Sequence, residues 1–175
     1  MRYVSLHGDA RVRALVLSAP VTPCVLQRDD FPFGIPESDF EAMRAGWLTD
    51  FGAWVSENAG PYFGDATVSA PLADLTIRTL MDTPLPVVLE THRTLTRADL
   101  RADLARLEVP VTVIHGTLDA SAPFEATGRP TADLVPHSHL VAVEGAGHGM
   151  YHAHREEYTR ALLDAVGGTG PARNS

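Results

Sequence analysis

The chain has 175 residues, of which 45% are hydrophobic, and its formal net charge at pH 7 is −8. This length corresponds to about one domain, and the hydrophobic fraction is sufficient for a packed core. Because binding to a phosphate backbone requires a surplus of cations, the negative charge predicts that nucleic acid is not a partner.

The sequence shows no sign of export or membrane insertion. No stretch approaches the roughly 20 apolar residues that span a bilayer, and the segment 1–7 lacks the apolar core of a signal peptide. The single cysteine, Cys24, excludes an internal disulfide framework and is typical of a reducing compartment. We therefore expect a cytoplasmic protein without a membrane partner.

Three short apolar runs predict the strands of an α/β fold. They occupy 12–19, 109–115 and 140–143 and alternate with helical patterns, which favours parallel strands. Continuous apolar strands of this kind fit a sheet that is covered on both faces.

A long helical insertion separates the first strand from the second. It begins after Pro20 and ends near Leu107, which is too long for a simple crossover, so we expect a cap over the sheet. The predicted units are a first strand unit (1–23), a helical cap (24–95), a core that carries the acid and the histidine (96–166) and a flexible tail (167–175).

Short sequence signals predict where helices of this fold begin and end. Apolar residues at helical spacing predict a cap helix from Phe40 to Val55, and the pair at 60–61, Gly-Pro, breaks this pattern. Ser69, with Pro71 two positions later, is predicted to begin a second helix. Thr96 with Asp99 resembles a capping box that opens a short helix, and a last amphipathic helix is predicted over 151–166.

Two polar residues follow predicted strands. Asp119 comes four residues after the expected strand end at His115, and His148 lies in the loop after the third strand. Because ligands bind at the carboxyl ends of parallel strands, we expect both side chains on one rim of the sheet. A carboxylate there can accept the Nδ1 proton of the imidazole, so that Nε2 faces a nucleophile. Each residue taken singly also fits a structural role in a turn or loop.

The segments around this pair resemble the C-terminal part of the α/β-hydrolase family. The segments 110–119 and 144–149 carry the likeness, and 2–19 resembles the helix and strand that follow the family's nucleophile. The most similar group is that of the cofactor-free esterases, also called non-heme haloperoxidases. The resemblance implies a partial α/β-hydrolase fold with about three C-terminal parallel strands, flanking helices and a helical cap insertion. It implies no cofactor, Asp119 as the triad acid and His148 as the triad base.

The nucleophile of such a triad has no counterpart in the sequence. None of the eight serines lies in a G-x-S-x-G elbow, which by the family's layout would precede Arg2 by roughly ten residues. Both expected oxyanion donors are absent with it. Cys24 lacks the strained turn that exposes a nucleophile, and Ser121 lies too close to the acid. We therefore expect a hydrolase that is inactive alone.

A metal site is the alternative chemistry. His148, His152 and His154 cluster in sequence, but no H-E-x-x-H motif or cysteine pair accompanies them. We therefore predict no metal.

The cap predicts where a ligand binds. Trp47 and Phe51, together with Cys24 and Met150, are candidates for the lining of a pocket for a small apolar, ester-like substrate. The alternative is that the cap aromatics only pack the cap onto the sheet.

The resemblance leaves three possibilities for function. The chain is the C-terminal part of a serine hydrolase, a non-catalytic remnant that binds a small ligand or a protein, or one half of an enzyme completed in trans. In each case the first strand presents an open, apolar sheet edge, so self-association or docking of an N-terminal fragment is expected there.

Overall fold

The computed structural model describes residues 1–167, and its centre is a parallel sheet of three strands. β2 (Val111–Gly116) lies between β1 (Leu15–Ser18) and β3 (His139–Val143). The strands coincide with the three apolar runs of the sequence to within a few residues. The predicted α/β architecture with parallel strands is therefore confirmed.

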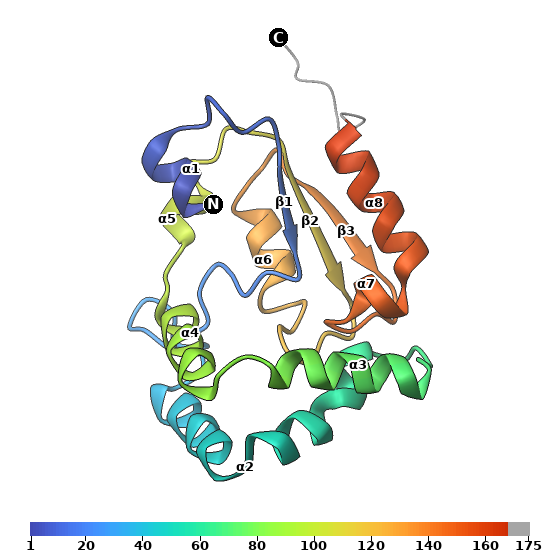
Figure 1. The fold of residues 1–175 in the computed structure, drawn as a ribbon. Coiled ribbons are helices and arrows are strands. Elements are labelled where there is room, and N and C mark those ends of the chain that lie inside the picture. Colours follow the sequence, from blue (N-terminus) through green and yellow to red (C-terminus); the bar gives the residue numbers. More distant parts are fainter. Residues whose placement is uncertain (168–175) are drawn as a thin grey trace.

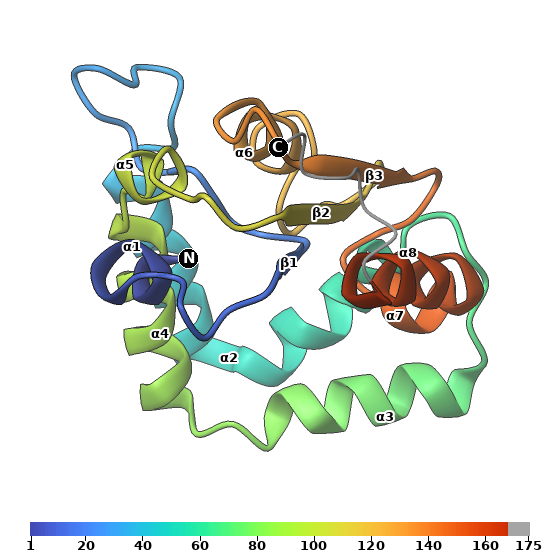
Figure 2. The same ribbon diagram turned by 90° about the horizontal axis from the view of Figure 1, so that it is seen from above.

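Helices cover both faces of this sheet, as Figures 1 and 2 show. α6 (Gly128–Asp133) packs on one face, and α8 (Arg155–Gly167) packs on the other, directly after the short α7 (Met150–Ala153). α1 (Arg2–His7) and α5 (Arg101–Leu104) contact each other beside the sheet. This double cover explains why the central strand β2 is buried along nearly its whole length.

Two separate apolar clusters fill the spaces above and below the sheet. Val113 belongs to the first, with residues of α1, α5 and the α6 region, whereas its neighbour Ile114 belongs to the second, with Met150 and residues of α8. Neither Val113 nor Ile114 is exposed. Successive side chains of a strand point to opposite faces, so β2 contributes to both clusters in turn.

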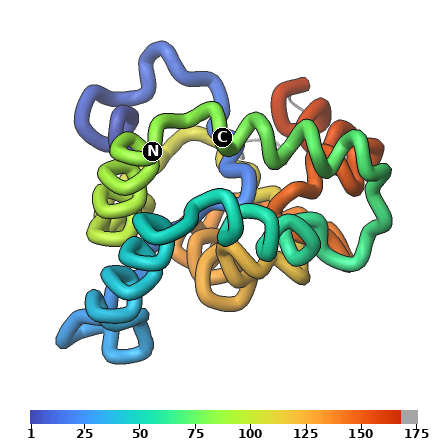
Figure 3. The backbone as a smooth tube through the Cα atoms, turned by 60° about the horizontal axis from the view of Figure 1, so that its bottom comes forward, coloured from blue at the N-terminus to red at the C-terminus, as the bar shows by residue number. Residues whose placement is uncertain are grey.

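Three long helices form the cap at the end of the sheet to which the strands point. They are α2 (Glu37–Phe63), α3 (Ala70–Met81) and α4 (Leu85–Arg97), and Figure 3 shows them crossing in front of that end. α2 is kinked at Asp50, whose backbone is not helical. The Asp50 carboxylate accepts the backbone N–H of Ala53 (2.8 Å) and thereby caps the second half of the helix.

The structure corrects several of the helix predictions. Pro61 does not end α2, which continues to Phe63. Thr96 opens no capping box, because it lies in the last turn of α4, where its hydroxyl donates to the carbonyl of His92 (2.9 Å). The last helix is interrupted at His154, between α7 and α8.

The structure also bears on the limits of the predicted units. α4 runs through the cap boundary expected at residue 95, and the tail expected at 167–175 lies, from residue 168, outside the described residues. None of the helices within residues 1–167 is both long enough and apolar enough to cross a membrane.

Candidate active site

The fold brings Asp119 and His148 into contact at the rim of the sheet. Asp119 follows the end of β2 and His148 follows the end of β3, so the parallel order of these strands carries both side chains to the same end. Asp119 Oδ2 accepts a hydrogen bond from His148 Nδ1 at 2.8 Å. The pair that the sequence suggests is thus assembled, although 29 positions separate its members along the chain.

The Asp119 carboxylate is fixed by several donors. Its Oδ1 accepts the backbone N–H groups of Ser121 (2.8 Å) and Ala122 (2.7 Å). Its Oδ2 lies 3.3 Å from His115 Nε2 in addition to its bond from His148. Burial by itself raises the pKa of Asp119, but the hydrogen bonds from His115, His148 and Ala122 outweigh it, and the pKa falls well below its usual value. The carboxylate is therefore ionised at neutral pH and holds one orientation.

The hydrogen bond to Asp119 also fixes the tautomer of His148. An ionised carboxylate only accepts hydrogen bonds, so Nδ1 must carry a proton, and Nε2 of the neutral ring keeps its lone pair. Within residues 1–167 this Nε2 has no hydrogen-bond partner. The ring lies against Tyr62, with 5.6 Å between the ring centroids. His148 is thus arranged as a base.

His115, expected from the sequence only at the end of a strand, belongs to the site. Its side chain is completely buried, and Nε2 lies 2.8 Å from the carbonyl oxygen of Ala122, to which it donates. The same Nε2 lies near Asp119, so His115 fixes the turn that carries the acid. The spacing of four residues between His115 and Asp119, at the end of an apolar strand, is the sequence signal by which this role could have been found.

The loop that carries His148 is held from both sides. On the side of the acid, Leu118 N–H donates to the carbonyl of Ala146 (2.9 Å), and Gly145 N–H donates to the Thr117 hydroxyl (2.9 Å). On the side of the cap, Gly149 N–H donates to the carbonyl of residue 62, at the end of α2 (2.7 Å). The histidine is therefore positioned by the sheet and the cap together.

A cavity of about 470 Å³ opens beside His148, between the cap and the sheet end. Trp47 lines it, as the sequence suggested, but Cys24, Phe51 and Met150 do not. Met150 is buried in the core below the sheet, and Phe51 stacks on Trp54 instead. The lining consists of Val21, Met43, Trp47, Trp54, Val55, Asn58, Ala59, Pro61, Tyr62, Phe63, Ala73, Thr76, Ile77, Leu80, His92, Leu95, Ala120, Ser121 and His148.

No nucleophile completes the pair inside the described part of the chain. Ser121 lines the cavity, but it contributes its backbone N–H to Asp119, and no hydrogen bond joins its hydroxyl to His148. Cys24 is almost completely buried away from the cavity. Burial is the main cause that raises the pKa of its thiol, which makes the reactive thiolate scarcer.

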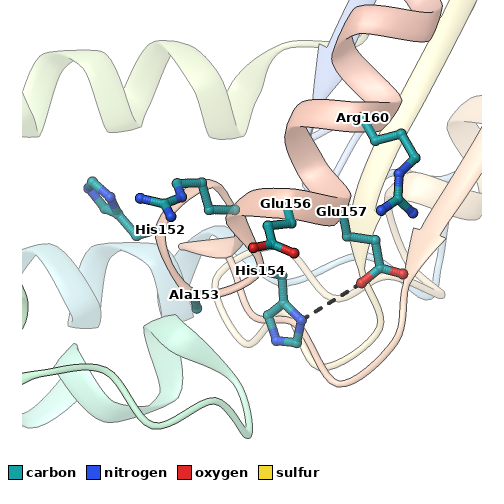
Figure 4. A pocket seen from close by; sticks show the side chains of 7 residues that line it. His152, Ala153, His154, Glu156, Glu157 and Arg160 are labelled. Carbon is teal, nitrogen blue, oxygen red and sulfur yellow. Dashed lines mark ion pairs between the residues drawn. The ribbon is translucent and has the colours of Figure 1, made fainter.

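A second hollow lies on the surface at α7 and α8, where Figure 4 shows His154 beside Glu157 and His152 pointing away from both. His154 Nδ1 lies 4.0 Å from Glu157, and its Nε2 lies 3.8 Å from Asp65. Both distances are long for an ion pair. Over residues 1–167, no three His, Cys, Asp or Glu side chains are placed to hold a metal ion.

The lowered pKa of Asp119 predicts an acid-sensitive fold. The unfolded chain binds this proton more readily, so the stabilisation is complete above the unfolded pKa of about 3.9 and is lost as the pH falls towards the folded pKa. We expect the free energy of urea unfolding to fall more steeply below about pH 4 in the wild type than in Asp119→Asn. Equal slopes in the two proteins would contradict this expectation.

Several curated relatives of this chain are non-heme chloroperoxidases or esterases, although no protein-family model matches the chain. A non-heme chloroperoxidase from Streptomyces lividans is 31% identical over 170 residues, which cover 94% of this chain and 62% of that enzyme. The chain thus spans about 60% of the length of the curated relatives that it matches.

Solved structures share the fold. The bromoperoxidase from Bacillus anthracis has a TM-score of 0.87 and 27% identity, over 95% of this chain and 62% of that one. The esterase EaEST from Exiguobacterium antarcticum also has a TM-score of 0.87, with 25% identity over 95% of this chain and 61% of that one. In both, the common part is about three fifths of the larger protein.

Proposed function

We propose, from the kinship of this chain with the non-heme haloperoxidases and esterases of the α/β-hydrolase fold, that Asp119 and His148 are the acid and base of an acyl-transfer triad. The observation that carries the proposal is the 2.8 Å hydrogen bond from His148 Nδ1 to Asp119 Oδ2, which leaves Nε2 free beside an apolar cavity. That geometry is the one that a serine hydrolase requires of its acid and base.

The roles of the two residues follow from their protonation states. His148 Nε2 takes the proton of a serine hydroxyl as its oxygen attacks the carbonyl carbon of an ester, and then gives that proton to the departing alcohol. Asp119 stays ionised and stabilises the imidazolium that exists between these two steps. The mostly apolar lining of the cavity suits a small apolar ester.

Turnover needs a serine nucleophile at His148 together with oxyanion donors, and within residues 1–167 no serine hydroxyl hydrogen-bonds to His148. We therefore expect this chain by itself to be nearly inactive. Loss of the nucleophile alone costs on the order of 10⁶ in kcat in a serine protease. Hydrolysis of p-nitrophenyl acetate by the purified chain should therefore equal that of the His148→Ala variant, and Ser121→Ala should also leave it unchanged. A rate typical of complete esterases that His148→Ala abolishes would contradict the proposal, and loss in Ser121→Ala would identify Ser121 as the nucleophile.

The free edge of β1 supports completion in trans. Among the described strands β1 pairs only with β2, so the N–H and C=O groups along its other side are available to a further strand. We propose that a strand carrying the nucleophile elbow pairs there, with self-association as the competing use of the edge. Sedimentation that shows a monomer at all concentrations would exclude self-association. A reactive fluorophosphonate that labels a serine only after a partner has bound would support completion.

A further inference from the structure

One residue of the cap, Tyr62, contacts the loop that carries His148 through three different groups. Its ring lies beside the imidazole of His148, with 5.6 Å between the ring centroids. Its carbonyl oxygen accepts the backbone N–H of Gly149 (2.7 Å), and its hydroxyl lies 2.7 Å from the hydroxyl of Tyr151. Tyr62 is the last residue but one of α2. The end of this cap helix is therefore bound to three residues of the segment 148–151.

The ring of Tyr62 is packed directly on the backbone next to His148. A Cβ at Gly149 would lie only 2.6 Å from Cε1 of Tyr62 and 2.7 Å from its Cδ1. A residue with a side chain would therefore push the ring away, whereas glycine allows this close approach. The ring thus forms a wall against the loop at the position of the base.

The hydroxyl of Tyr62 fixes the other end of the ring. Burial first, and the hydrogen bond with Tyr151 second, raise the pKa of Tyr62 above its usual value, so the hydroxyl is protonated at neutral pH. One hydroxyl of the pair therefore donates its proton to the oxygen of the other. Tyr151 belongs to α7, which begins two residues after His148. The ring is thus held by its backbone at one end and by its hydroxyl at the other.

The backbone after Tyr62 continues the contact between the cap and the loop. Asp65 N–H donates to the carbonyl of Gly145 (3.0 Å), and Gly64 forms an antiparallel bridge with Ala146. Together with the bond to Gly149, these contacts join residues 62–65 to residues 145–149. The position of the Tyr62 ring relative to the loop is therefore set by several backbone contacts as well as by its own hydroxyl.

His148 needs such a neighbour because its bond to Asp119 holds only one of its nitrogens. That bond joins Nδ1 to Oδ2 at 2.8 Å, and the side chain of His148 remains 29% exposed. A single hydrogen bond at the edge of a ring restricts its rotation less than a hydrogen bond combined with packing against its face or edge. The ring of Tyr62 supplies this packing, at an angle of 57° to the imidazole.

We infer that Tyr62 is a positioning residue for the base. Its ring, fixed by the hydroxyl of Tyr151, keeps the imidazole of His148 in the orientation in which Nδ1 reaches Asp119 and Nε2 is free to react. The role of His148 as a base rests on the proposed function. The cap therefore does more than cover the cavity, because the end of α2 also orients a group of the reaction centre.

Exchange of the His148 Nδ1 proton with water tests the inference. This proton exchanges when the imidazole rotates away from Asp119, and NMR of the full chain with ¹⁵N-labelled histidine measures its rate without turnover. We expect Tyr62→Leu, which removes the ring and the hydroxyl, to raise the rate about tenfold or more. Tyr62→Phe and Tyr151→Phe lose the same hydrogen bond, so each should raise it about fivefold. The double phenylalanine variant should exchange no faster than either single one.

Tyr158→Phe is the matched control. Its ring also lies beside Tyr151, with 6.4 Å between the centroids, but its hydroxyl makes no hydrogen bond within residues 1–167. This variant should leave the exchange rate unchanged. Backbone amide exchange in β2 is measured alongside, because a loss of global stability raises it as well. An increase at the Nδ1 proton of His148 that exceeds the increase at these amides would support a positioning role.

Three results would overturn the inference: a wild-type rate in Tyr62→Leu, equal increases at His148 and in β2, or an effect of Tyr62→Phe that Tyr151→Phe lacks. Thermal melts establish that each variant is folded, and the two phenylalanine variants keep both rings, so they decide the question if Tyr62→Leu does not fold. A wild type in which His148 carries no proton on Nδ1 would overturn the Asp119–His148 proposal and this inference with it. A wild type with that proton, together with unaffected variants, would overturn only the role of Tyr62.

Discussion

Replacing Gly116 with alanine is expected to lower the free energy of unfolding by about 3 kcal/mol or more, the upper end of the cost of overpacking. A Cβ at this position would collide with the backbone carbonyl of Ala146 and with the backbone of Gly147. These atoms belong to the loop that carries His148, and Leu118 N–H already binds the same carbonyl. Because backbone cannot yield as a flexible side chain does, the variant must displace the loop or break β2.

Urea unfolding at neutral pH measures this loss, and Gly46→Ala provides the control. Gly46 lies on the exposed side of α2, where a Cβ would meet no atom within 4 Å. Alanine is there expected to stabilise the chain by up to about 1 kcal/mol, its advantage over glycine in a helix. A Gly116→Ala variant as stable as the wild type would show that the loop can move away without cost.

Replacing Asp119 with alanine is the second change for which we expect a large effect, a loss of about 3 kcal/mol or more. The carboxylate accepts the backbone N–H groups of Ser121 and Ala122 as well as the imidazole of His148. Each buried donor left without an acceptor costs about 1–3 kcal/mol. The Asp119 side chain is itself unexposed, so water reaches its partners poorly.

The Asp119→Asn variant separates the structural role of this residue from its electrostatic role. Its amide oxygen can still accept the two backbone N–H groups, whereas its NH₂ group faces His148 and cannot accept the Nδ1 proton. We expect it to retain more stability than the alanine variant but to lose the Nδ1–H tautomer of His148, which ¹⁵N NMR of the ring reports. An unchanged tautomer in the asparagine variant, or an alanine variant within 1 kcal/mol of the wild type, would contradict these roles.

Local patterns in the sequence were sufficient for the strands and for the class of fold. Each strand lies within a short apolar run, and the run that forms β2 is rich in β-branched residues. Such a run reflects burial on both faces wherever it lies in the chain. Asp119 and His148 were identifiable for a related reason: a residue that directly follows a parallel strand is carried to the ligand-binding edge of the sheet. The helix limits at Pro61 and Thr96 could not be predicted in this way. A local start or stop signal competes with the packing of the whole helix, which here continued α2 past Pro61 and placed Thr96 inside α4.

The sequence by itself thus determined the three strands, the α/β class and the two residues that meet at the rim. Only the tertiary structure decided what surrounds them: the second imidazole on Asp119, from His115, and the contact between the rings of Trp47 and His92 beside the cavity. Trp47 and His92 are 45 positions apart and belong to different helices. The periodicity of apolar residues predicts which side chains of a helix face inwards, but it does not predict which side chains of a distant helix they contact. The contacts between distant side chains form when the helices pack together. The kink of α2 and the position of α4 set which rings adjoin the cavity.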